Sequence, residues 1–311
     1  MPRALERRDI RAAPVTPGVP PEWPTLKNVL ASQGHSSDRR MYGKGVKRSV
    51  HYVLACVEGQ RQYPQSRRYP AMTVYLCHEQ PDLLDFEAEI IEAKPGAILL
   101  SRSALHPGGG GQVSDSATLE HANGVAIITG VRPEGDRCWH VLDDPQAVVS
   151  GPVSVRIDTE RRSWVSQLHT DTHLLNALIF DRYAGALVTG AQINADGTAR
   201  MDFDLPEADS DELRGLGPAL NDLITSAIEV RAVYVPASEA DTAPGLVRSL
   251  SVAPPPTPDG MLRIIEIAGV DRQACGGTHL TNTAQSSPVQ ITKVENKGRR
   301  NRRIRLRIAS D

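Results

Sequence analysis

The sequence of 311 residues predicts an α+β protein that is rich in strands before about residue 158 and mixes helix with strand after it. Short β-branched, apolar runs separated by Gly, Pro, Asn and Asp fill the first part from Val74 onward. A long segment with helical spacing of apolar residues follows them. Hydrophobic residues make up 40% of the chain and charged residues 23%, so a sizeable core can be buried.

The first 71 residues differ from the rest of the chain. They contain five prolines between residues 14 and 24, scattered basic residues and one short apolar run near Tyr52–Cys56. Neither helical nor strand periodicity is present, so we expect residues 1–71 to be disordered or weakly structured. A start codon wrongly assigned upstream of Met72, where periodic sequence begins, is the alternative.

Four runs in the first part have the composition of strands. Each is rich in Val, Ile, Leu or Ala and is bounded by turn residues, as in a small barrel or an open β domain. The four are Phe86–Ala93, Ala97–Ser101, Val125–Val131 and Pro152–Asp158.

One amphipathic helix is predicted over Arg161–Tyr183, where Trp164, Leu168, Leu175 and Ile179 recur at helical spacing. The next elements are shorter and are interrupted by helix breakers.

A strand is predicted at Ala199–Leu205, and Ser210 is the predicted cap of a helix with acidic residues in its first turn. The stretch Gly215–Pro218 should interrupt this helix before it resumes over Ala219–Val230. Near the C-terminus, "VQITKV" and "RIRLRI" flank "ENKGRRN". Because Ile304, Leu306 and Ile308 alternate with arginines, we expect a hairpin with one charged face.

The bulk properties exclude several classes of protein. The formal net charge of −2 argues against coating nucleic acid by bulk attraction, so any RNA contact must come from local basic patches. The four cysteines are far apart, which excludes a disulfide scaffold and favours a reducing compartment. No apolar run is long enough to span a bilayer, and the N-terminus lacks a secretory signal. We therefore expect a cytoplasmic protein without a membrane partner.

Two short motifs suggest a metal site. In "HTDTH", His169 and His173 are four residues apart, so a helix places both imidazoles on one face. In "CGGTH", Gly276 and Gly277 permit the tight backbone that turns Cys275 and His279 toward one centre. Three imidazoles and one thiolate form a borderline-soft donor set that suits one Zn²⁺ ion.

Spacing leaves the purpose of this zinc open. Four protein ligands can make a closed structural site, whereas a catalytic site keeps a position for water or substrate. The helix does not have the HExxH pattern, so the carboxylate base of metalloproteases is missing. Asp171 lies between the histidines but points away from their face at helical spacing.

Seven segments occur in the order that is typical of one protein family. They are "FEAEI", "SRSALHPGGGGQVSD", "RRSWVSQLHTDTHLL", "VTGAQI", "ARMDFDLP", "DRQACGGTHLTNT" and "ITKVENKGRRNRRIRLRI". In these segments the sequence resembles the editing domain of alanyl-tRNA synthetase and its free-standing relatives, the AlaX trans-editing proteins. The resemblance covers about Met72–Ile308 and includes nothing similar to an aminoacylation core.

The resemblance implies an architecture and a ligand set. It implies an N-terminal β-barrel-like domain, residues 72–158, packed on an α/β editing domain, residues 159–311, with a zinc site in the cleft between them. The zinc ligands would be His169, His173, Cys275 and, less securely as a direct ligand, His279.

The resemblance also gives the glycine-rich segment a function. "HPGGGGQVSD" is not a P-loop, because no Gly-Lys-Ser/Thr follows. In the family such a loop lies over the end of the substrate, so Gln112 becomes a catalytic candidate that contacts the ester or the terminal adenosine. The substrate-binding candidates are Gly109, Gly110, Gly111 and Thr278.

Two positions depart from the family's pattern. Ser103 stands where the family has a threonine that recognises the serine hydroxyl, so Ser103 is the candidate for this contact; the alternative is a loop serine bonded to its own backbone. Leu105 and His106 replace the aromatic pair that usually follows. The candidate contacts to the tRNA backbone are the densest basic cluster, Arg299, Arg300, Arg302 and Arg303.

The function that follows is a zinc-dependent, ATP-independent ester hydrolase that deacylates mischarged tRNA(Ala), carrying serine or glycine, and thereby protects translation fidelity. Two alternatives stay open. The zinc motifs also occur in threonyl-tRNA synthetase editing domains, so another mischarged amino acid can be the target. A zinc-stabilised RNA-binding module without catalysis is the second. No protein partner is predicted.

Overall fold

The computed structural model describes residues 74–309, except for residues 136, 244, 251–256 and 258–259. The prediction for residues 1–71 therefore lies outside the described residues. In the part of the chain that is described, no helix combines the length and the apolar character that crossing a membrane requires.

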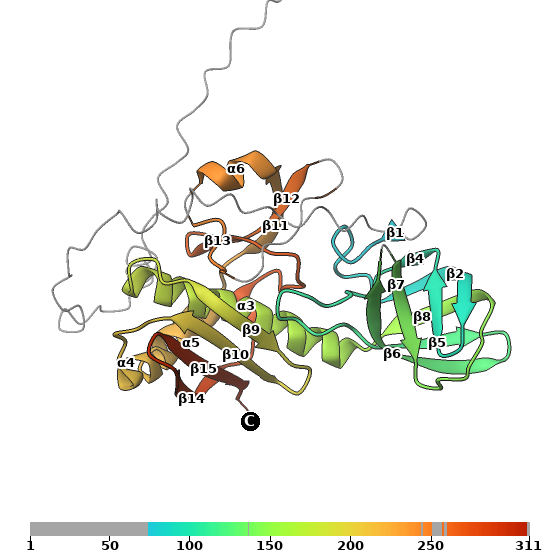
Figure 1. Ribbon diagram of the computed structural model, residues 1–311, viewed down its shortest axis with the longest axis horizontal. Coiled ribbons are helices and arrows are strands. Elements are labelled where there is room, and N and C mark those ends of the chain that lie inside the picture. Colours follow the sequence, from blue (N-terminus) through green and yellow to red (C-terminus); the bar gives the residue numbers. More distant parts are fainter. Residues whose placement is uncertain (1–73, 136, 244, 251–256, 258–259, 310–311) are drawn as a thin grey trace, which may run out of the picture.

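Six antiparallel strands close into a barrel in the order β2-β3-β7-β6-β5-β8, which forms one end of the molecule (Figure 1). The strands are β2 (Asp85–Lys94), β3 (Ala97–Leu100), β5 (Ala117–His121), β6 (Gly124–Glu134), β7 (Arg137–Leu142) and β8 (Gly151–Ile157). Inward-facing residues such as Phe86, Leu119 and Val155 make its core. The predicted barrel-like part is confirmed.

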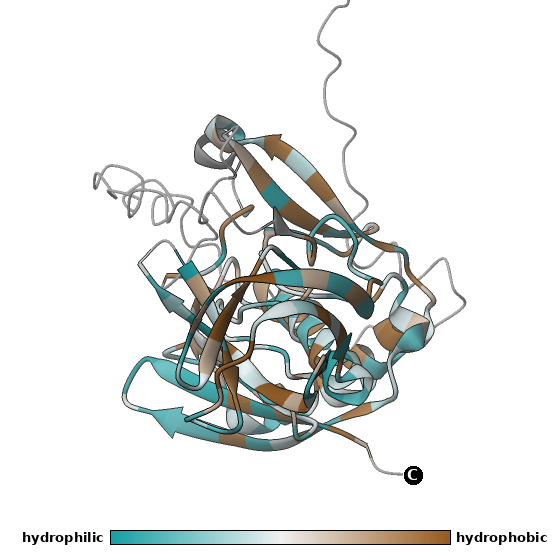
Figure 2. Ribbon diagram, turned by 90° about the vertical axis from the view of Figure 1, so that its right-hand side faces the viewer, coloured by the Kyte–Doolittle hydropathy of each residue, from teal (hydrophilic) through white to brown (hydrophobic). Residues whose placement is uncertain are grey.

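The barrel also shows why two of its strands were not predicted. Hydrophilic and hydrophobic residues both occur along the strands at the barrel end of the molecule (Figure 2), and in β2 exposed and buried residues alternate over Asp85–Glu89. Strand β7 has neither this alternation nor a continuous apolar run, because Arg137 and His140 interrupt its apolar residues, although Cys138, Trp139 and His140 are all buried. Strand β5 has only five residues. Next to the barrel, β1 (Val74–Tyr75) pairs in parallel with β4 (Arg102–Ser103).

Helix α3 (Thr159–Arg182) starts directly after the barrel, where the Asp158 side chain accepts a hydrogen bond from the backbone N–H of Arg161. The predicted helix is confirmed, but the predicted amphipathic character is wrong. Every residue from Val165 to Ile179 is buried, because other elements surround the helix. Its polar side chains in this stretch therefore need partners inside the protein.

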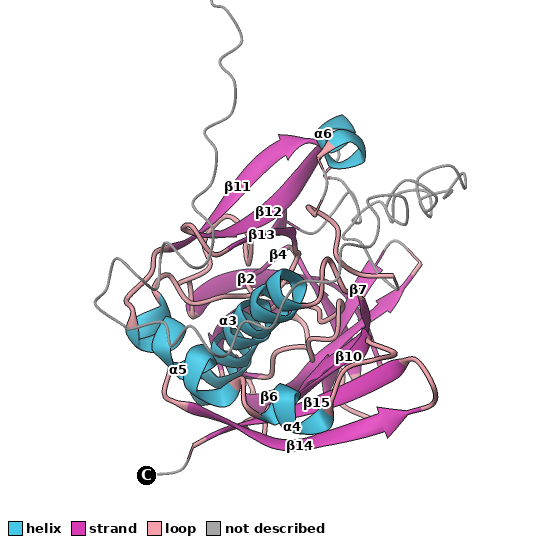
Figure 3. Cartoon of the chain, turned by 90° about the vertical axis from the view of Figure 1, so that its left-hand side faces the viewer, coloured by secondary structure: helices cyan, strands magenta, loops and turns pink. Residues whose placement is uncertain are grey.

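Two antiparallel sheets lie on opposite sides of α3 (Figures 1 and 3). One has the order β14-β15-β10-β9 and the other the order β11-β12-β13. Their strands are β9 (Val188–Ile193), β10 (Thr198–Asp204), β14 (Val289–Lys297) and β15 (Asn301–Ile308), and then β11 (Val230–Pro236), β12 (Met261–Ile267) and β13 (Asp271–Ala274). The short helices are α4 (Ser210–Arg214), α5 (Gly217–Thr225), α6 (Ala237–Thr242) and the 3₁₀ turn η1 (Thr283–Gln285).

The C-terminal hairpin is confirmed, and two details of the helical region are corrected. The cap of α4 is Asp209, not Ser210, because Asp209 keeps an extended backbone and its side chain accepts from the backbone N–H groups of Asp211 and Glu212. The predicted helix to residue 230 ends at Thr225. Ala227 has a φ of 53°, which no helix accommodates, and β11 begins at Val230.

A buried ion pair joins α3 to the segment that follows the glycine-rich loop. Arg162 donates to Asp115 at 2.5 Å, and their side chains are only 7% and 1% exposed. Arg162 also donates to the carbonyl oxygens of Ala104 and Pro81, while Asp115 accepts from the backbone N–H of His106. Four chain segments therefore meet at one guanidinium.

We expect Arg162→Met to lower the free energy of unfolding by about 3–5 kcal/mol, because it leaves the Asp115 carboxylate buried without a countercharge. Urea denaturation measures this. Arg156→Met removes an exposed pair with Asp85 and should leave the midpoint unchanged. Adding Asp115→Asn to Arg162→Met should recover part of the loss. An Arg162 variant as stable as the wild type would show that this pair does not hold the segments together.

Candidate metal centre

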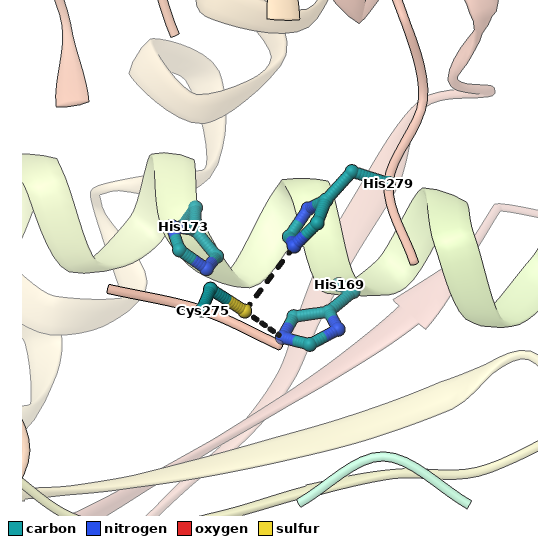
Figure 4. A group of neighbouring side chains, drawn as sticks. All are labelled: His169, His173, Cys275 and His279. Carbon is teal, nitrogen blue, oxygen red and sulfur yellow. Dashed lines mark hydrogen bonds between the residues drawn. The ribbon is translucent and has the colours of Figure 1, made fainter. Parts of the chain in front are cut away.

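Four side chains converge beside α3. His169 and His173 stand one turn apart on the helix, and Cys275 and His279 come from the loop after β13 (Figure 4). Cys275 Sγ lies 3.3 Å from Nε2 of His169 and 3.3 Å from Nε2 of His279. One donor atom from each residue lies within 4.8 Å of the others, so the described residues bring together a group that could hold one metal ion.

Each imidazole is oriented by a partner on its other nitrogen. Nδ1 of His169 donates to Oε1 of Gln112 at 2.8 Å, and Nδ1 of His173 donates to Asp271 at 2.8 Å. Nδ1 of His279 lies 3.4 Å from the hydroxyl of Thr170. Because Nδ1 of each ring meets a protein partner, Nε2 is the nitrogen that is left to bind a metal.

The charges in this cluster favour the deprotonated thiol, which is the form of cysteine that binds a metal. Burial by itself raises the pKa of the Cys275 thiol, but His169 and His279 outweigh burial and hold this pKa well below its usual value. Burial lowers the pKa of His173, but the hydrogen bond to Asp271 and the nearby Cys275 outweigh it and raise this pKa to about 10. A bound metal ion would take the place of the proton that the metal-free cluster keeps near the thiolate.

The loop that carries Cys275 is held by three side chains at successive carbonyl groups. Arg263 of β12 donates to the carbonyl oxygens of Cys275 and Gly277, at 2.8 and 3.0 Å. His78 and His106 both donate to the carbonyl of Gly276, at 2.6 and 2.8 Å. Burial lowers the pKa of His106 to about 4, so this ring is neutral and its Nδ1 accepts from the backbone N–H of Gly108.

Gly277 is required for a specific steric reason. A Cβ atom on this residue would lie 2.0 Å from Cε1 of His169 and 2.6 Å from Oε1 of Gln112. The sequence predicted that glycines here permit a tight backbone. At Gly277 a side chain is excluded because the ring of a candidate ligand, His169, lies too close.

The glycine-rich loop connects the barrel to this cluster. Gly108, Gly109, Gly110 and Gly111 all have positive φ, from 63° to 114°, which glycine adopts without strain. Gly109 and Gln112 exchange two backbone hydrogen bonds, so the loop is a tight turn. Gly111 accepts from the backbone N–H of Ile193 at 2.7 Å, whereas Gly109 and Gly110 are exposed.

Gln112 and Thr278, two predicted site residues, contact each other directly. Gln112 Nε2 donates to the hydroxyl of Thr278 at 3.0 Å, and Gln112 Oε1 accepts from the backbone N–H of Thr278 at 3.0 Å. Ser166 also donates to the Thr278 hydroxyl, at 2.8 Å. The Gln112 amide is therefore fixed on both ends beside His169.

Ser103, in contrast, makes its hydrogen bonds to a barrel residue and to its own chain segment. Its side chain is fully buried, and its hydroxyl is hydrogen-bonded to His140 Nε2 at 2.8 Å and to the backbone N–H of Leu105. Neither contact belongs to the metal cluster. Asp171 points away from the histidines, as expected: it accepts from the hydroxyl of Ser286, and burial raises its pKa to about 8.

The structure does not bring the four predicted arginines together as one cationic surface. Arg300 pairs with Asp204 and Arg303 with Asp202. Arg302 points to the other side of β15 and donates to the carbonyl oxygens of Ala208 and Pro206. The physical reason is the two-residue period of the strand, which sends adjacent side chains to opposite faces.

Several functional neighbours were missed by the sequence analysis. Asp271, Arg263, Thr170 and His78 were not singled out, although all of them hold a ligand or its loop. Asp271 lies four residues before Cys275, and a search for acidic partners near the ligands would have found it.

Comparisons with known proteins agree with this geometry. A family model described as "Threonyl and Alanyl tRNA synthetase second additional domain" matches residues 262–305. The chain is 33% identical to the alanyl-tRNA editing protein AlaX-M of Saccharolobus solfataricus over 236 residues, which cover 75% of this chain and 98% of the relative. It is also 33% identical to AlaX-M of Methanosarcina barkeri over 230 residues, 71% of this chain and 92% of the relative. The chain belongs to the AlaX-M family of alanyl-tRNA editing proteins.

The chain is also similar in sequence to part of a much larger protein. The chain is 32% identical to the alanine–tRNA ligase of Korarchaeum cryptofilum over 228 residues, which cover 72% of this chain but only 25% of that ligase. The AlaX-M chain therefore matches a quarter of the ligase, and it matches AlaX-M proteins over nearly their whole length.

We expect Gly277→Ala to weaken metal binding by about 10- to 100-fold, because the new methyl group displaces His169 and the Gln112 amide that orients it. Competition with a chelator measures the affinity. Gly217→Ala is the matched control, since a Cβ there meets nothing within 4 Å and its φ is not positive. Equal affinity for the variant and the wild type would show that the close contact of Gly277 with the His169 ring does not determine metal binding.

Proposed function

We propose that this AlaX-M protein is a Zn²⁺-dependent hydrolase that removes serine or glycine from mischarged tRNA(Ala). The observation that carries the proposal is the buried cluster of one thiol and three imidazoles beside an exposed glycine-rich turn. The similarity to alanyl-tRNA editing proteins supports it, since this chain covers 98% of one of them.

The residues present fit Zn²⁺. Imidazole nitrogen and thiolate sulfur are the donors that Zn²⁺ prefers, and the three rings already present Nε2. Bound there, Zn²⁺ would supply Lewis-acid polarisation or an anchoring point for the substrate. His279 is only half-buried and its Nδ1 partner is the most distant of the three, so we propose that it would be the least firmly held of the four ligands.

The chain's own residues then have positioning functions. An aminoacyl ester is already activated, so the site needs to orient the ester and one water rather than generate a strong nucleophile. Gln112 holds the His169 ring, and the exposed backbone of Gly109 and Gly110 is available to the terminal adenosine or the ester. No carboxylate base stands among the four donors, because Asp171 faces Ser286.

The proposal includes a two-part organisation of the chain. We propose that residues 72–158 and 159–311 act as two domains with the zinc site between them. Helix α3 starts at Thr159 directly after the last barrel strand. Gln112 and His106 come from the first part, and the ligands they support come from the second.

The activity can be tested with tRNA(Ala) carrying serine, glycine or alanine. We expect hydrolysis of the seryl and glycyl esters and little hydrolysis of the alanyl ester, with activity lost on chelation and restored by Zn²⁺. Cys275→Ala should reduce turnover by at least about 100-fold, since it removes a ligand. Cys138→Ala, a buried cysteine of the barrel, should keep activity.

The same panel separates the alternatives. Metal-dependent hydrolysis of a different mischarged tRNA would reassign the substrate within editing. Tight tRNA binding without metal-dependent hydrolysis of any ester would replace the enzyme by a zinc-stabilised RNA-binding module.

Ser103 is tested by comparing two substrates. Because its hydroxyl is bonded to His140, we expect Ser103→Ala to lower stability by about 1 kcal/mol and to slow seryl- and glycyl-tRNA hydrolysis by the same factor. Initial rates on both esters and a thermal melt measure these effects. A loss confined to the seryl ester would return Ser103 to recognition of the serine hydroxyl.

A further inference from the structure

The outer face of the four-stranded sheet carries a row of cationic side chains. The inner face packs on α3 through buried residues such as Phe203, Ile304 and Leu306. Because side chains alternate along a strand, the residues between them point outward. Three of the outward positions on β15 are occupied by Arg303, Arg305 and Arg307. A fourth arginine, Arg200, points outward from β10.

The strand register aligns these residues across the sheet. Arg200 pairs with Gln192 of β9 on one side and with Arg305 on the other, and Arg305 pairs with Lys293 of β14. This row spans three strand spacings, or about 14 Å. Over it lies a hollow of about 670 Å³, whose lining also includes Asn194 and Thr198.

Two acidic side chains on this face form ion pairs with the cationic side chains but do not neutralise all of their positive charge. Asp202 is shared by Arg200 at 2.8 Å and Arg303 at 2.7 Å. Glu295 is shared by Arg305 at 2.8 Å and Lys293 at 3.1 Å, and these bonds lower the pKa of Glu295 to about 2. Sharing leaves an excess of positive charge, and no described carboxylate pairs with Arg307.

The row ends next to the glycine-rich loop. Strand β9 is an edge strand, and its Gln192 faces the hollow. The neighbouring residues hold the loop: Ile193 donates to the carbonyl of Gly111, and Ala191 packs on Gly111. A nucleic-acid strand that follows the cationic row therefore reaches the edge where Gly109 and Gly110 are exposed.

We propose that this outer sheet face binds the ribose-phosphate backbone of the tRNA whose 3′ end enters the metal site. Arginine forks match phosphate oxygens, and the neighbouring amides and hydroxyl of Gln192, Asn194 and Thr198 suit ribose 2′-hydroxyls. The inference rests on the proposed function only for the identity of the RNA. Of the predicted tract Arg299–Arg303 it keeps only Arg303, and it places the other contacts at the outward-facing alternate positions of β15 and β10.

The test is the salt dependence of binding to uncharged tRNA(Ala). The variant carries Arg200→Gln, Arg305→Gln and Arg307→Gln, and it keeps Arg303 so that the partly buried Asp202 stays paired. Loss of three phosphate contacts should reduce the slope of log affinity against log salt by about 2 to 3 units, at roughly 0.7 to 0.9 per phosphate. The control carries the same charge change at exposed arginines elsewhere: Arg132→Gln, Arg156→Gln and Arg214→Gln.

Metal content and a thermal melt check that both variants are folded. We expect the control to keep the wild-type slope, and the sheet variant to keep its hydrolysis rate at saturating tRNA. An unchanged slope in the folded sheet variant, or an equal loss in the control, overturns the proposal. These results are independent of catalysis, because uncharged tRNA is the probe. If the wild-type protein hydrolyses no ester, the proposed function fails. If the sheet variant then still shows the reduced salt slope, this inference stands without it.

Discussion

Most of this structure depends on holding the loop Cys275–His279 against one turn of α3. A thiol and three imidazoles are buried together there, and buried polar groups are costly unless each has a partner. The partners come from every side: Gln112 from the glycine-rich loop, Asp271 from β13 and Thr170 from α3 itself. The carbonyl groups of the loop are occupied as well, so its path has little freedom.

The barrel supports the metal cluster through a few specific contacts. It sends Gln112 to the candidate ligand His169 and His106 to the loop that carries Cys275, and the Arg162–Asp115 pair fixes the segment between them to α3. A closed barrel has no free edges, which makes it a rigid support for such a segment. The barrel can therefore affect the metal site without contributing a ligand.

The local motifs could be predicted from the sequence, and the long-range partners could not. The spacing of His169 and His173 on a helix brings two candidate ligands together by itself, and the CxxxH motif adds the other two candidates once the chain folds back. Four of the barrel strands were also predictable from their β-rich, apolar composition between turn residues. No sequence pattern connects Ser103 to His140 or Gln112 to His169, because these contacts join residues tens of positions apart.

The arginine tract shows the same limit in another form. A basic run in the sequence suggests one surface, but a strand sends Arg302 and Arg303 to opposite sides. The alternation with Ile304 and Leu306 already contained this information, since apolar residues on one face put the arginines on the other.

The four glycines of the loop have two different reasons to be glycine. At Gly108 and Gly111 a Cβ atom would lie 3.0 and 2.8 Å from neighbouring backbone, so space as well as φ excludes a side chain. At Gly109 and Gly110 nothing lies within 4 Å, and only the positive φ requires glycine. The loop is thus anchored at both ends and open in the middle, which leaves the central peptide groups facing solvent beside Gln112 and His169. A bare backbone at that point also leaves room for the close approach of the ester or adenosine that the proposed function brings there.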